Sequence, residues 1–177
     1  MRSSESRSRG IAHPGLGRSF PMQRDYIMRL VEQIAALVAS IIAKERAGQY
    51  PEAKADIEAK ARQTIGLSLA DLRKLSPEAV SKLLSGSGGL RYGRAVIVAE
   101  LLLHDATVSE ATGNASEALL SRVHAFCLLS DTIDSLAEED QATYRPRLDA
   151  LATELRGLPA HPYLSAKLDA YRPQGDT

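Results

Sequence analysis

The sequence is short of several residue types, and each shortage excludes a class of protein. Its 177 residues include one cysteine, Cys127, so an intrachain disulfide is impossible and nothing favours an oxidising compartment. Acidic and basic residues number 22 each, so no net charge favours nucleic acid or an anionic membrane. Tryptophan is absent and aromatic residues make up 5% of the chain, so the core must rely on aliphatic side chains. We therefore expect a cytoplasmic protein that binds neither nucleic acid nor membrane.

Long apolar runs are also missing. The most apolar stretch covers residues 34–43, whereas a membrane-spanning helix needs about 20 apolar residues. Residues 1–21 contain no apolar run of signal-peptide length, so we expect no secretory signal. They are rich in Arg, Ser and Gly, which favours a disordered basic tail, although organellar transit peptides have a similar composition. We expect residues 173–177 to form a second disordered tail.

Apolar residues instead recur with helical spacing. In residues 22–47 they are three or four positions apart, which gives one face of an amphipathic helix. Comparable patterns, separated by Gly, Pro and Ser, continue to the end of the chain, and none alternates as a strand does. We predict an all-α fold, a compact bundle of antiparallel helical hairpins with about seven to eight helices, in a single domain over residues 22–172.

Two turns, 65 residues apart, share one pattern. The first has Gly48, Tyr50 and Ala53, and the second has Gly113 and Ala118 without the aromatic residue. Glycine permits a left-handed turn, and a small alanine lets two helices approach closely. The spacing resembles the turns of tetratricopeptide-type hairpins. Since a regular array repeats about every 34 residues, we predict two such hairpins in one bundle rather than an open superhelix.

A second resemblance lies at the start of the predicted domain. The segments Gln23–Arg29 and Val31–Ile34 are similar to the opening helix of a family of small bacterial helical proteins of unknown function. The resemblance implies a tetratricopeptide-like fold and a bacterial cytosolic protein. It implies no catalytic residue.

Three residues are candidates for a metal or acid–base site. Glu100 and His104 are four positions apart on one predicted helix, so they share a face. If the turn centres on Gly113, His124 on the returning helix lies near the level of His104. A carboxylate and two imidazoles can hold a metal or exchange a proton. The alternative is that the histidines lie on a polar flank or satisfy local hydrogen bonds.

The stretch SGSGGLRYGR is a candidate anion site. Gly88 and Gly89 precede a helix whose first N–H groups are free, and Arg91 and Arg94 follow within one turn. The stretch lacks the phosphate-loop pattern and follows a helix rather than a strand. The alternative interpretation is a linker between two halves of the domain.

Two further features have simpler interpretations. Cys127 lies in an apolar helical run, which predicts an inert buried thiol. Residues 131–140 contain five acids without a calcium-loop pattern, which is typical of a solvated helix end.

These patterns favour a non-enzymatic, tetratricopeptide-like interaction or assembly module that binds a protein or peptide partner. The wide apolar face of residues 22–47 also favours a homo-oligomer. The alternative is a ligand- or phosphate-binding sensor, or a hydrolase-type enzyme, that uses the Gly-Arg loop or the Glu100/His104/His124 cluster. We expect no cofactor.

Overall fold

The structure is a computed structural model that describes residues 21–84, 91–158 and 161–173. The predicted tails therefore lie almost entirely outside the described residues. The all-α prediction is confirmed, because the described residues form eight α-helices and one 3₁₀ helix and contain no strand. The elements are α1 (Pro21–Arg46), α2 (Tyr50–Ile65), α3 (Leu69–Leu72), α4 (Pro77–Leu84), α5 (Arg91–Ala111), α6 (Ala115–Thr132), η1 (Ile133–Ser135), α7 (Glu138–Leu155) and α8 (Pro162–Ala170).

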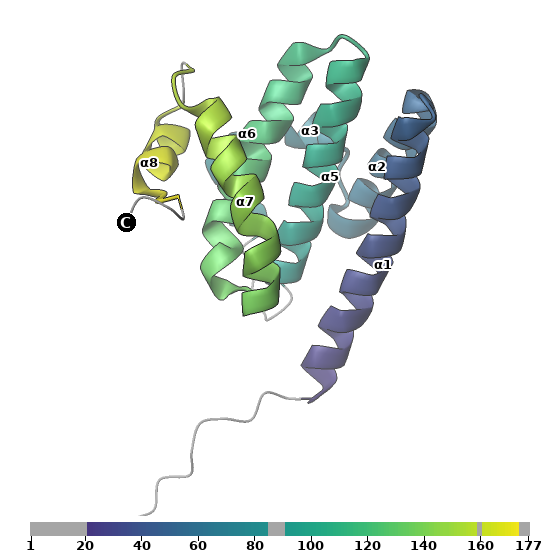
Figure 1. Cartoon of the computed structure of the whole chain (residues 1–177), viewed down its shortest axis with the longest axis horizontal. Helices are drawn as coiled ribbons and strands as arrows, with labels where there is room; N and C mark the ends of the chain where they lie inside the picture. Colours follow the sequence, from purple (N-terminus) through teal and green to yellow (C-terminus); the bar gives the residue numbers. More distant parts are fainter. Residues whose placement is uncertain (1–20, 85–90, 159–160, 174–177) are drawn as a thin grey trace, which may run out of the picture.

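The long helices lie side by side in the order α1, α2, α5, α6 and α7, as Figure 1 shows. Helices α1 and α2 form one hairpin, α5 and α6 form the second, and α2 packs against α5. The short helices α3 and α4 connect the hairpins, and α4 packs on α6. Helix α8 packs against α6 and α4.

The two glycine turns have the same geometry. Gly48 and Gly113 have φ angles of 72° and 82°, a left-handed conformation that favours glycine. In each turn the glycine N–H donates to the carbonyl three residues earlier, and the next N–H donates to the carbonyl five residues before it. Ala53 and Ala118 lie one turn into the following helices, and both are buried. Tyr50 begins α2 and packs, half-buried, against the core.

The other boundaries follow from local chemistry. Ser68 caps α3, where its hydroxyl accepts a hydrogen bond from the Asp71 N–H at 3.0 Å. Pro77 begins α4, at a position where a missing N–H costs nothing. Helix α7 begins at Glu138 and continues through Pro146, which lies inside the helix.

Aliphatic side chains from all the hairpin helices form one core. Helix α5 contributes more residues to this core than any other described helix, because it is covered by α2 on one side and by α6 on the other. The only aromatic pair in the described core is Phe126 against Tyr171, whose ring centroids are 5.8 Å apart in an edge-to-face arrangement. Within the described residues, no helix is both long enough and apolar enough to cross a membrane.

Candidate functional site

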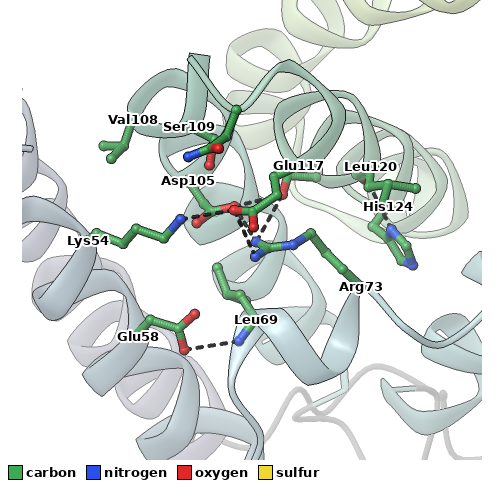
Figure 2. A network of polar contacts seen from close by, with 12 residues as sticks. Lys54, Glu58, Leu69, Arg73, Asp105, Val108, Ser109, Glu117, Leu120 and His124 are labelled. Carbon is green, nitrogen blue, oxygen red and sulfur yellow. Dashed lines mark hydrogen bonds and ion pairs between the residues drawn. The ribbon is translucent and has the colours of Figure 1, made fainter. Parts of the chain in front are cut away.

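A partly buried network of charges joins four segments of the chain (Figure 2). Arg73, which follows α3, donates to Asp105 of α5 across 2.5 Å, and Ser121 of α6 donates to the same carboxylate oxygen at 2.7 Å. Arg73 also lies 3.3 Å from Glu117 of α6, which in turn accepts from Lys54 of α2 at 3.0 Å. Positive and negative groups therefore alternate along the network, and they tie the α3 connection to both hairpins.

The network is structural in character, because its charges neutralise one another. The hydrogen bond from Lys54 lowers the pKa of Glu117, against the opposing effect of burial, so this carboxylate is ionised. The sequence pattern does contain a signal for Asp105 that the predictions missed. Asp105 lies four residues after Leu101 and three before Val108. Leu101 and Val108 are both buried, and they share a face of α5 with Asp105. A charged residue on such a face must have a buried partner.

The predicted metal residues Glu100 and His104 lie together but take other partners. His104 Nδ1 is 3.1 Å from Glu45 Oε1 of α1, and His104 Nε2 is 3.9 Å from Glu100 Oε2. Arg147 of α7 donates to Glu100 across 2.5 Å. The side chains of Glu45, Glu100 and His104 are largely buried. Their contacts, together with Arg147, join α1 and α7 to α5.

His124 does not join this cluster. Its Nδ1 lies 2.8 Å from the carbonyl oxygen of Leu120, and its Nε2 lies 3.0 Å from that of Leu75. Both ring nitrogens therefore face backbone oxygens, and His124 fixes the α3–α4 connection to α6. The predicted convergence of Glu100, His104 and His124 is not found. Among the described residues, no group of three or more His, Cys, Asp or Glu side chains is placed to hold a metal ion.

The predicted anion site falls largely outside the described residues. Gly88 and Gly89 are not described, and only the backbone of Arg91, at the start of α5, is placed. Arg94 is exposed one turn into α5. Cys127 is buried in α6, and burial raises the pKa of its thiol to about 12, with Asp131 adding to the effect. A thiol that stays protonated is a poor nucleophile.

A pocket of about 540 Å³ opens between α4, α5, α6 and α8. Its size falls within the range of about 300–1,000 Å³ that is usual for ligand sites. Leu84, Ala95 and Leu128 form an apolar floor, and polar side chains form the walls and rim. The lining residues are Glu78, Ser81, Lys82, Leu84, Ala95, Leu128, Asp131, Thr132, Ser135 and Tyr163.

One carboxylate organises the polar wall of this pocket. Asp131, in α6, accepts hydrogen bonds from Ser81 of α4 and from the Tyr163 hydroxyl of α8, the latter at 2.9 Å. Lys167 of α8 donates to the other oxygen of Asp131 and lies 5.4 Å from the centroid of the Tyr163 ring. At the rim, Lys82 pairs with its helical neighbour Glu78 at 2.7 Å.

The protonation states of these groups oppose nucleophilic catalysis. Burial raises the pKa of Tyr163, so its hydroxyl is neutral near pH 7. Burial alone would lower the pKa of Lys167, but the hydrogen bond and charge of Asp131 raise it, so the ammonium stays charged. Neither group can act as a base for the Ser81 hydroxyl, which is itself bonded to the Asp131 carboxylate.

Three comparisons, with models of protein families, with curated proteins and with solved structures, found no match for the chain. The resemblance to a bacterial helical family therefore stays a prediction.

Proposed function

We propose that the protein is a non-enzymatic, tetratricopeptide-like interaction module that holds a short segment of a partner protein in the pocket between α4, α6 and α8. Two helical hairpins with matching glycine turns lie side by side, which is the framework on which such modules present a binding face. We further propose that the protein works in the bacterial cytoplasm, as the resemblance of its first helix implies.

The observation that carries the proposal is the division of the pocket into an apolar floor and a paired polar wall. The polar groups of the wall are held by one another, with Asp131 at the centre. The apolar lining residues Leu84, Ala95 and Leu128 are only 2–6% exposed, so a side chain from outside would reach them at the bottom of the pocket. An enzyme needs polar groups that converge on a reacting atom, and a binding module needs an apolar pocket with a polar rim.

The test inserts a large side chain at the mouth of the pocket. Ser135 lines the pocket and is exposed, so Ser135→Trp narrows the opening without disturbing the core. Thr153→Trp, on the exposed side of α7, is the matched control for an added tryptophan. Peptides are selected from a random library displayed on phage against the unaltered protein, and their Kd values are measured by fluorescence anisotropy.

We expect the selected peptides to bind the unaltered protein and Thr153→Trp equally, and to bind Ser135→Trp at least tenfold more weakly. Equal binding to all three proteins would place the peptide site elsewhere and refute the proposal. Failure to select any peptide would also refute it.

Self-association through α1 is a second candidate. Helix α1 has 26 residues and α2 has 16, so α1 is longer by about 15 Å. Figure 1 shows the start of α1 extending beyond the rest of the bundle. The amphipathic pattern of the sequence continues through this part of α1. We propose that it pairs with a second copy of the chain. Sedimentation equilibrium of the unaltered protein and of Leu30→Asp tests this. We expect the unaltered protein to associate and Leu30→Asp to be a monomer, and a monomer in both cases would contradict the proposal.

A further inference from the structure

The pocket opens beside a segment with an excess of negative charge. Residues 131–140 contain five acids and no basic residue. Asp131 is neutralised by Lys167, and Asp134 lies 3.2 Å from Arg145. The other three acids form the first turn of α7, at Glu138, Glu139 and Asp140. None of these three has a basic partner among the described residues.

The unpaired carboxylates lie close to the mouth of the pocket. Ser135 lines the pocket, and Glu138 follows three residues later, so their Cα atoms are at most about 11 Å apart. Glu138 and Glu139 are both exposed. Their position at the start of α7 suits the helix dipole, which stabilises carboxylates there without using up their capacity to bind a cation.

The basic groups of the pocket are already occupied. Lys82 pairs with Glu78, and Lys167 pairs with Asp131. A phosphate or carboxylate ligand would have to displace one of these pairs and would then face the unpaired acids of α7. A cationic ligand meets no such cost, because the unpaired groups at the mouth are all negative.

We propose that the segment held in the pocket is basic, with an apolar side chain on the floor and Lys or Arg side chains paired with Glu138 and Glu139. This inference rests on the proposed function and adds the chemistry of the partner to it. An extended peptide advances about 3.3 Å per residue, so a peptide residue beside Ser135 lies within about three or four positions of one that pairs with Glu138. The rim charges set the orientation and association rate, and the anchor supplies the affinity.

The test uses the peptides selected in the phage experiment, with the full-length protein. Selection at 50 mM NaCl is expected to enrich sequences in which Lys or Arg lies within about four positions of Leu, Ile, Val or Phe. Glu138→Gln combined with Glu139→Gln removes the two exposed charges. Glu52→Gln is the control, because Glu52 is likewise an exposed acid in the first turn of a helix, α2.

We expect the double variant to bind the peptides at least fivefold more weakly, Glu52→Gln to bind them unchanged, and 300 mM NaCl to weaken binding to the unaltered protein. Neutral or acidic selected peptides, or unchanged binding by the double variant, overturn the basic-partner inference. If Ser135→Trp still blocks those peptides, the proposed function survives that result. If Ser135→Trp has no effect on any peptide, the proposed function fails and this inference fails with it.

Discussion

Arg73 and Asp105 are 32 positions apart in the chain, and they form a 2.5 Å ion pair in which the carboxylate is wholly buried. The pair joins the connection between the two hairpins to the centre of α5. Removing one partner of a buried ion pair leaves an uncompensated charge, which costs about 3–5 kcal/mol. The fold therefore depends on this pair in a way that the length and amphipathic pattern of the helices do not show.

We expect Arg73→Met, which leaves the wholly buried Asp105 carboxylate without a cation, to lower the free energy of unfolding by about 3–5 kcal/mol, as measured by urea denaturation. The double variant Arg73→Met with Asp105→Leu is the control, because it replaces both charges by apolar groups. It should recover most of the loss. A loss below about 1 kcal/mol for Arg73→Met would show that the pair contributes little.

Gly113→Ala tests the turn between α5 and α6. A Cβ atom at Gly113 would meet no other atom within 4 Å, so any cost comes from the backbone, whose φ is 82°. We expect a loss of about 1–2 kcal/mol in the free energy of unfolding. Gly113→Asn should cost less, because asparagine tolerates the left-handed conformation better. Equal stability of the alanine variant and the unaltered protein would argue against this turn geometry.

His124→Leu tests whether this histidine holds the α3–α4 connection. The substitution removes the contact between His124 and the Leu75 carbonyl, and the loss of one hydrogen bond costs about 0.5–1.5 kcal/mol. His124→Gln keeps a donor at a similar position and should cost less. Thermal unfolding of the two variants measures the difference. If His124→Gln lowers the unfolding temperature as much as His124→Leu does, the shape of the histidine side chain matters and its hydrogen bond does not.

Cys127 gives the stability of the protein a pH dependence. Its thiol has a pKa of about 12 in the folded protein and about 8.5 in an unfolded chain. Between these values the unfolded chain binds fewer protons, so stability is complete below about pH 8.5 and falls as pH rises toward 12. We expect Cys127→Ala to lose this decline, which is at most about 1.4 kcal/mol per pH unit. Urea denaturation of both proteins at pH 8 and pH 10 measures the free energy of unfolding. An equal decline between the two pH values in Cys127→Ala and in the unaltered protein would contradict the prediction.

The sequence was sufficient to predict the helices, because their apolar spacing and the glycine turns are local signals. Gly48 and Gly113 lie where the pattern places the turns. The position of His124 shows where local reasoning stops. Aligning two helices about Gly113 brings His124 level with His104, but it cannot show that the α3–α4 connection covers His124 and supplies the Leu75 carbonyl.

The pocket could not be predicted for the same reason. Asp131 is visible in the sequence as one of a run of acids, but its partners Ser81, Tyr163 and Lys167 are 50, 32 and 36 positions away. They come from two short helices whose packing on α6 has no spacing signature. Long-range packing therefore decides which acid becomes part of the pocket wall and which stays exposed at its mouth.

The most direct test of the docking site is an amide chemical-shift titration of the ¹⁵N-labelled, full-length protein with a selected basic peptide. If the partner segment binds as proposed, the largest shifts fall at the pocket residues Ser81, Leu128, Thr132 and Ser135, with Glu138 and Glu139 beside them. Largest shifts along α1 and α2, with those of the pocket residues unchanged, would contradict the account.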